Sequence, residues 1–311
     1  MPILTIHHKT EYRYAHPVAF GEHRIMLRPR DGHDLRVLSS ELEIVPQPMS
    51  LRWIHDVFGN SVAIATFDER AESLTFTSTA TVEHNPAEEF ALTPDDEAYF
   101  YPFIYDDEEF PDLVQFVTPQ YGDPHGELSA WARQFLDPDG PTPTFNILSG
   151  MTHGIRDAFS YRKRHEHGTQ HPLDTLQMAS GTCRDYALFM IEALRRLGIA
   201  ARFVSGYIFV PGDSAHGYVG GGSTHAWVQV YLPSAGWIEF DPTNGIVGTR
   251  DLVRVAVARD PRQAVPLHGT YLGSADAFVG MDVNINVVSI GEERHDFVAD
   301  SARKLLNQTS P

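Results

Sequence analysis

The pattern of hydrophobic and polar residues divides the chain into a strand-rich first part and a helix-containing second part. In residues 1–85, β-branched and aromatic residues gather in five runs, several of which alternate with polar residues, as half-buried strands do. Short turn-forming segments separate these runs, and no helical stretch interrupts them. The pattern predicts a small N-terminal β-sandwich over residues 1–88, built from the runs at 3–14, 22–29, 37–46, 62–69 and 73–84, with a turn at Pro17.

From residue 127 the hydrophobic spacing becomes three to four residues, which is typical of amphipathic helices. This spacing predicts two helices near 128–136 and 145–159, and a third from Thr182 to Leu197 that stops at Gly198. Helices followed by strands favour an α+β domain with an antiparallel sheet, which we assign to residues 127–290. Its predicted strands are the runs at 200–210, 225–232, 236–241 and, more loosely, 281–290.

A segment rich in both acids and aromatic rings joins the two parts. Between Pro86 and His125 the chain has eleven acidic residues and no lysine or arginine. Its aromatic residues are too many for a free linker, so we interpret residues 89–126 as a connector whose rings pack on a domain while its acids face water. A calcium site is disfavoured because the oxygen-bearing residues lack regular spacing. Residues 291–311 form a polar tail.

Charge and composition exclude several classes of function. The 311 residues carry a net charge of −17, which argues against a nucleic-acid binder and against docking on an anionic membrane. No apolar run has the length of a transmembrane helix, and the first residues lack the pattern of a signal peptide. We therefore expect a cytoplasmic protein with neither nucleic acid nor membrane among its partners.

The single cysteine is the first candidate for chemistry. One cysteine forms neither an intramolecular disulfide nor a cysteine-rich zinc site, so Cys183 is either a buried apolar residue or a reactive thiol. Thr182 is a good N-cap and Asp185 follows three residues later, which places Cys183 in the first turn of the predicted helix. There the free backbone N–H groups and the helix dipole favour the thiolate and can stabilise an oxyanion.

Two predicted strands supply partners for this cysteine. His225 opens one strand and Asp241 ends the next, with a short turn between them. The two side chains share a face only if the paired residue numbers have an even sum, as when Tyr231 pairs with Trp237, and we predict this register. In it, Cys183 attacks a carbonyl, His225 carries the proton, and Asp241 orients the imidazole and stabilises its cation.

These residues also carry a family resemblance. The segments GTCRDYALFMIEALRRLGIAARFVSGY and STHAWVQVYLPSAGWIEFDPTNG resemble the core of the bacterial transglutaminase-like superfamily, whose Cys, His and Asp fall on Cys183, His225 and Asp241. HHKTEYRY, MLRPR and the Asp-x-Phe-Gly-Asn at 56–60 resemble the N-terminal region that accompanies this core. The resemblance implies a papain-like α+β fold and a transglutaminase or cysteine protease activity. Animal transglutaminases place an oxyanion-donating tryptophan upstream of the cysteine; Trp131 is the only tryptophan between the connector and Cys183, and Tyr161 is a substitute.

The sequence thus favours a thiol protease or amidase, a hydrolase that acts on a peptide or protein amide through a thioester, without a cofactor or metal. The same triad with an amine in place of water is an acyltransferase that crosslinks glutamine side chains, so transglutaminase activity is the first alternative. A second alternative is a non-catalytic binding module that retains the fold. A third is a metal-dependent hydrolase that uses His165, His167 and His171.

Overall fold

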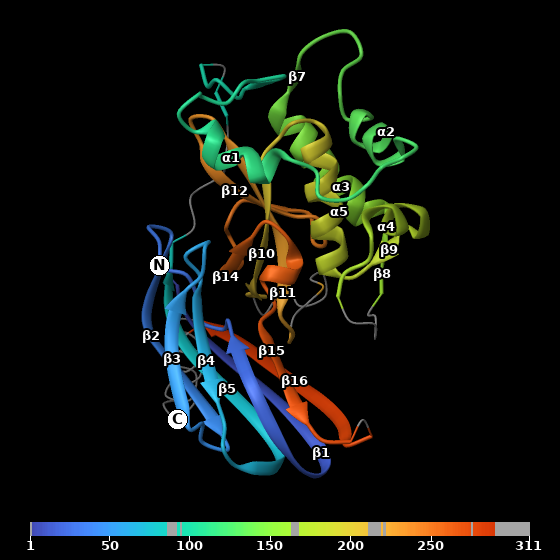
Figure 1. Cartoon of the computed structure of the whole chain (residues 1–311). Helices are drawn as coiled ribbons and strands as arrows, with labels where there is room; N and C mark the ends of the chain where they lie inside the picture. Colours follow the sequence, from blue (N-terminus) through green and yellow to red (C-terminus); the bar gives the residue numbers. More distant parts are fainter. Residues whose placement is uncertain are drawn as a thin grey trace, which may run out of the picture.

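The computed structural model describes residues 2–85, 92–93, 95–162, 168–210, 219, 222–274 and 276–289. It contains two main sheets, with helices gathered on the second (Figure 1). The α+β class and the antiparallel sheet predicted from the sequence are confirmed. None of the described helices has the length and hydropathy needed to cross a bilayer.

The first sheet has seven strands and is curled (Figure 1). The β-rich N-terminal part is confirmed, and one strand that the pattern missed, β3, lies at the edge of the sheet. Its long first strand continues through Pro17, where we expected a turn, because the pairing with β5 shifts between Arg13 and Val18 and so tolerates a residue without an N–H donor. The strands are β1 (Ile3–Ile25), β2 (Leu35–Val45), β3 (Ser50–His55), β4 (Ser61–Thr66), β5 (Arg70–His84), β15 (Leu267–Leu272) and β16 (Phe278–Ser289).

The end of the described chain returns to this first sheet. β15 and β16 both pair antiparallel with β1, although their residues fall inside the core predicted at 127–290. The predicted strand near the end of that range exists, but its sheet differs from our assignment. The physical reason is the length of β1, whose 23 residues leave backbone donors and acceptors along one edge for two further strands.

The second sheet carries the residues of the predicted site. Its strand order is β13 (Ile246–Val247), β12 (Gly236–Asp241), β11 (His225–Leu232), β10 (Ala201–Ile208) and β14 (Leu252–Ala258). Ala226, Val228 and Val230 on one face of β11 belong to the main hydrophobic core, with the apolar residues of α5 (Cys183–Arg196). The alternation predicted for this strand is therefore present, and it turns His225 and Trp227 to the opposite face.

Four further helices surround α5, which lies centrally in the second part (Figure 1). Two of them correspond to the predicted helical segments, and two short ones, α1 and α4, were not predicted. They are α1 (Phe110–Val117), α2 (Glu127–Arg133), α3 (Thr144–Ala158) and α4 (Pro172–Met178), and a short 3₁₀ helix follows at Pro261–Gln263. Two-residue strands complete the structure: β6 (Phe100–Tyr101) with β7 (Thr142–Pro143), and β8 (Ser160–Tyr161) with β9 (Ser180–Gly181).

Part of the predicted connector packs on the second part of the chain, whereas its Phe100 and Phe110 side chains are exposed. Tyr105, Leu113 and Phe116 are buried in a cluster of their own, whereas Asp106 and Asp107 are exposed. The Tyr105 hydroxyl donates to the Tyr231 carbonyl and accepts from the Ala200 N–H, which joins the connector to the second sheet.

Two polar contacts fix the first sheet to the second. The Asn60 side chain bonds both the N–H and the carbonyl of Val257 on β14, at 2.9 and 2.8 Å, so it acts as an extra pairing residue at that edge. Asp56 in turn accepts from the Asn60 amide at 2.8 Å, which gives the Asp-x-Phe-Gly-Asn segment a structural role. Arg254 of β14 bridges Asp34 beside the first sheet and Glu239 of β12.

The predicted tail, 291–311, lies outside the described residues.

Candidate active site

Cys183 lies at the start of the central helix, as the capping pattern predicts. It is the first residue of α5, and Thr182 is the N-cap with extended backbone angles. Asp185 accepts from the Thr182 N–H and hydroxyl, both at 2.8 Å, which is one half of a capping box. The cysteine is 6% exposed and packs against the main core, so the helix holds its sulfur in a fixed position.

The turn before Cys183 is held by a tight contact between backbone and carboxylate. A Cβ added at Gly181 would lie 2.8 Å from the Cβ of Asp185, so a larger residue there would push the cap apart. The other oxygen of Asp185 accepts from the Gln170 N–H at 2.7 Å, and this bond ties the preceding loop to the helix end. The first N–H groups of α5 have no acceptor within the helix. Because Cys183 is the first residue of this helix, its side chain starts beside these N–H groups.

His225 and Asp241 meet in the predicted register. Tyr231 pairs with Trp237 and Val228 with Phe240, so His225 is diagonal to Asp241 across β11 and β12. The His225 Nε2 atom donates to Asp241 Oδ2 at 2.7 Å, and both side chains are fully buried. Asp241 Oδ1 also accepts from the Thr243 N–H at 2.8 Å, which orients the carboxylate.

The electrostatics of this pair favour a charged imidazole. Burial by itself lowers the pKa of His225, but the charge of Asp241 and the hydrogen bond to it outweigh burial and raise the pKa to about 10. Burial conversely raises the pKa of Asp241, whereas the histidine and the N–H donors around the carboxylate bring it below its ordinary value. An imidazolium paired with a carboxylate is therefore the stable state at neutral pH.

Cys183 is a further neighbour of the His225 imidazole. Nδ1 is buried and has no hydrogen bond of ordinary geometry within the described residues. The Cys183 side chain nevertheless interacts with the imidazole closely enough to raise the pKa of His225 further. The contact is thus looser than a fully formed hydrogen bond. Cys183, His225 and Asp241 are brought together at one end of the second sheet.

Asn244 is a neighbour that the sequence did not single out. Its Nδ2 atom donates to Asp241 Oδ2 at 2.8 Å and lies 3.3 Å from His225 Nε2. Its Oδ1 atom accepts from the Val219 N–H at 2.7 Å, so the amide is held from both sides. The available signal was its place three residues after Asp241, in a tight turn where Asn is common.

Tyr161, and not Trp131, lies next to the cysteine. Burial, followed by the negative charge of the Cys183 thiolate, raises the pKa of the Tyr161 hydroxyl, so the tyrosine lies near the sulfur. The β8–β9 pair places it there, because Tyr161 pairs with Gly181, two residues before the cysteine. Trp131 packs instead on Phe189, with ring centroids 4.6 Å apart, in the middle of α5. The tryptophan therefore has a packing role, and the tyrosine occupies the position beside the sulfur.

Only one of the three histidines proposed as metal ligands lies within the described residues. His165 and His167 lie outside those residues, and His171 caps α4 by accepting from the Leu173 N–H at 3.2 Å. In the part of the chain that the structure describes, no three His, Cys, Asp or Glu side chains gather with the geometry of a metal site.

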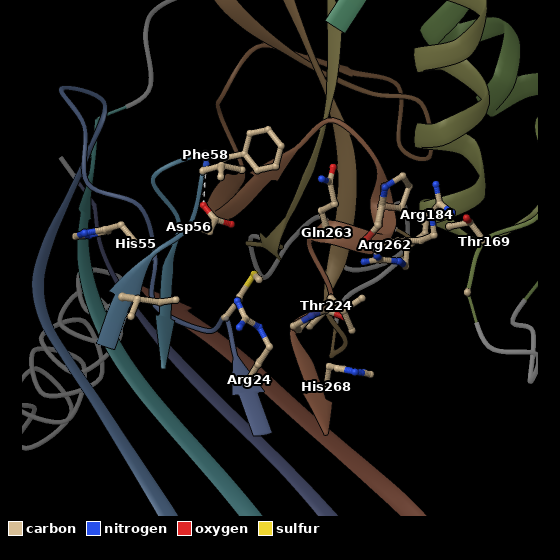
Figure 2. A pocket seen from close by; sticks show the side chains of 17 residues that line it. Arg24, His55, Asp56, Phe58, Thr169, Arg184, Thr224, Arg262, Gln263 and His268 are labelled. Atoms are coloured by element: carbon tan, nitrogen blue, oxygen red, sulfur yellow. Dashed lines mark hydrogen bonds between the residues drawn. The ribbon is translucent and has the colours of Figure 1, made fainter. Parts of the chain in front are cut away.

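A pocket of about 840 Å³ adjoins the three residues (Figure 2). Cys183, His225 and Asp241 do not line it, but Arg184 and Thr224, which directly follow and precede the first two, do. Its other walls come from β1, from the end of β3 with the turn after it, and from the segment between β14 and β15. The pocket therefore lies between the two sheets and reaches the edge of the candidate site.

Comparison with known families matches both parts of the chain. Residues 4–83 match the bacterial transglutaminase-like N-terminal region. Residues 132–242 match the transglutaminase-like superfamily, and this range contains Cys183, His225 and Asp241. The two matched ranges correspond to the first sheet and to most of the second part, so the resemblance found in the sequence covers both.

Individual relatives agree with this assignment. An uncharacterized protein of Mycobacterium leprae is 29% identical over 286 residues, which cover 86% of this chain and 92% of the relative. A protein-glutamine gamma-glutamyltransferase of Pseudomonas aeruginosa is 40% identical over 73 residues, 23% of this chain and 11% of that protein. The solved structure of a "Putative Cysteine Protease" from Cytophaga hutchinsonii superposes with a TM-score of 0.68 and 20% identity, and the match covers 93% of this chain and 91% of that one. Residues 132–242 are thus a transglutaminase-like core, and residues 4–83 are the bacterial transglutaminase-like N-terminal region.

Proposed function

We propose that this protein is a cysteine-dependent acyl-transfer enzyme that acts on amide or peptide bonds. Cys183 Sγ attacks the carbonyl carbon, and the His225 imidazolium gives its proton to the departing amine. Water then attacks the thioester, His225 takes a proton from it, and the carboxylic acid leaves as the sulfur is released. Asp241 keeps the imidazole oriented and stabilises its cation through both steps.

One observation carries this proposal. A fully buried histidine is bonded to a buried aspartate at 2.7 Å, and this aspartate and a cysteine at a helix start raise its pKa. Burying two titratable groups costs free energy of folding, and strongly perturbed pKa values of this kind gather at active sites. Tyr161 and the first N–H groups of α5 are the donors available to the oxyanion, since both adjoin the sulfur.

Protein crosslinking is a second candidate for the same site. It differs only in the acceptor, because an amine in place of water attacks the thioester and leaves a new amide. The local similarity to a protein-glutamine gamma-glutamyltransferase favours keeping this candidate. We propose hydrolysis as the main reaction, because water needs no second binding site.

The test is a screen of peptide and glutamine-containing substrates, with and without an added primary amine. Release of a carboxylic acid that depends on Cys183 supports hydrolysis, whereas incorporation of the amine supports crosslinking. Cys183→Ala is the inactive control, and Trp131→Phe is a matched control that alters an aromatic residue away from the sulfur. Equal turnover by the wild type and Cys183→Ala would overturn the proposal, and binding without turnover in both would favour a binding module.

A further inference from the structure

The pocket beside the candidate site is cationic, although the protein as a whole is acidic. Three arginines line it, Arg24, Arg184 and Arg262, with His268 beside the first. The one carboxylate among the lining side chains, Asp56, is already bonded to the N–H groups of Phe58 and Asn60 and to the Asn60 amide. Of the described residues that line the pocket, none belongs to the acidic connector.

The three arginines differ in how far their charge is already used. Arg262 forms a two-point ion pair with Asp260, at 2.7 and 3.0 Å. Arg184 donates to the Pro261 carbonyl at 2.8 Å and stacks over Phe203. Arg24 has neither an ion pair nor a side-chain hydrogen bond with any described residue. It is a half-buried cation without a counter-charge, which a bound carboxylate would supply.

Arg24 and His268 are held side by side. They are directly paired across β1 and β15, so their side chains share one face of the first sheet. Figure 2 shows both on the sheet side of the pocket, with Arg184 and Arg262 on the core side. Met26, Ile54 and Phe58 add an apolar part to the pocket wall. Such a wall suits the methylenes of a side chain that ends in a carboxylate.

The position of the pocket defines which part of a substrate would enter it. Arg184 and Thr224 line it and are the chain neighbours of Cys183 and His225, so one end of the pocket is formed by residues next to the candidate site. A group bound there belongs to a residue next to the amide under attack.

We infer that this pocket is a substrate subsite for an acidic residue, and that the enzyme prefers peptides with Glu or Asp beside the scissile bond, recognised by Arg24. This rests on the proposed function, whose site it extends. The net charge of −17 does not oppose it, because at physiological ionic strength charges beyond about 8 Å are largely screened. The local charges of the pocket therefore decide recognition.

The test compares matched peptides with Glu, Gln or Lys at each position near the cleaved amide. At one of these positions we expect kcat/KM to be about tenfold higher for Glu than for Gln, with Lys lowest, because a charge-assisted hydrogen bond is lost and then replaced by repulsion. Arg24→Gln should bring the Glu-to-Gln ratio toward one. Arg13→Gln is the matched control, since it removes the same charge from the same strand at an exposed ion pair with Asp282. It should leave the ratio unchanged.

A second measurement separates this inference from the proposed function. Binding of the same peptides to Cys183→Ala, followed by fluorescence anisotropy, needs no turnover, and should show the same preference and the same loss in Cys183→Ala/Arg24→Gln. Turnover that depends on Cys183 but shows no Glu preference, or keeps it in Arg24→Gln, would overturn the subsite and leave the function standing. Preferential binding of acidic peptides without any turnover would overturn the function and leave the subsite.

Discussion

Two buried histidines, one in each sheet, have opposite electrostatics. His8 on β1 is 2% exposed. Its ring nitrogens form hydrogen bonds with two hydroxyl groups, those of Tyr207 at 2.9 Å and Thr10 at 3.0 Å. Burial lowers its pKa to about 4. His225 on β11 is 1% exposed, yet its bond to Asp241 raises its pKa to about 10. Equal burial thus gives a neutral imidazole in one region and a cation in the other.

The two pKa values differ because of the hydrogen-bond partner of each histidine and not because of the degree of burial. A hydroxyl bonds a neutral imidazole as well as a charged one, so it does not offset the cost of burying the charge. A carboxylate does offset it. His8 therefore joins the two sheets as a neutral structural group, whereas His225 is held as a cation by Asp241. The predictions below test this contrast.

The largest difference is expected in turnover. His225→Ala should lower kcat/KM for any amide substrate found by about 10⁴-fold or more, because the proton carrier is lost. His8→Gln should leave kcat/KM within about twofold at pH 7, since its loss removes only neutral hydrogen bonds far from the sulfur. Steady-state kinetics of both purified variants provides the measurement. A comparable loss in His8→Gln would contradict the assignment of the two roles.

Asp241→Asn should remove the property that distinguishes His225. The amide no longer stabilises the imidazolium, so kcat should fall by about 10³-fold while the protein still folds. Because the main cause that raises the pKa of His225 is lost, this pKa should fall, and the alkaline limb of the pH–rate profile should move to lower pH. If the alkaline limb of the profile did not move, it would reflect the titration of a group other than His225. The Cys183→Ala/Asp241→Asn double variant should be no worse than Cys183→Ala alone.

Stability should depend on pH in opposite directions at the two histidines. The pKa of His8 is lower in the folded protein than the ordinary 6.5 of the unfolded chain, so its contribution is present above pH 6.5 and is lost as pH falls toward 4. From pH 7.5 to 5 the wild type should lose about 2 kcal/mol of unfolding free energy more than His8→Gln. For His225, whose pKa is raised, the contribution is present below pH 6.5 and is lost as pH rises toward 10.

Urea unfolding of the wild type, His8→Gln and His225→Ala at pH 5, 7.5 and 9.5 measures both effects. Equal pH dependence of the wild type and His8→Gln would show that His8 does not titrate between its folded and unfolded values. A His225→Ala variant that loses stability on alkalinisation as steeply as the wild type would remove the contrast.

The smallest effect is expected on chemical labelling. Cys183 in the native protein should react with iodoacetamide at pH 7, and His225→Ala should slow the reaction by about tenfold, because the imidazolium no longer favours the thiolate. His8→Gln is the control and should label at the wild-type rate. If Cys183 stays unlabelled until the protein unfolds, the sulfur is an inert core group.

Local patterns in the sequence were sufficient to predict the helix start and the strand face that carry the residues of the site. Thr182 and Asp185 are three residues apart, so their capping contact, and with it the place of Cys183, depends only on the first turn of one helix. The alternation along β11 likewise fixes which residues share a face with His225. The family resemblance rests on these same segments.

Strand register and the contacts between distant segments could not be predicted from local patterns alone. The turn between β11 and β12 allowed registers that separate or join His225 and Asp241, and packing selected the one in which Tyr231 faces Trp237. Tyr161 reaches Cys183 only through the β8–β9 pair, and Arg24 faces a pocket only because β15 returns to β1.

The sequence by itself determined the order of the elements, the helix start that holds the cysteine, and the faces of the strands, because each depends on residues within about one turn or one hairpin. Only the tertiary structure decided which strands joined which sheet, which histidine was buried against the hydroxyl of Tyr207, and where the pocket lies between the two sheets. Those outcomes depend on pairings between segments more than 100 residues apart, such as His8 with Tyr207 and Arg24 with His268. Their free energies come from burial and competing edge strands, which no local pattern contains.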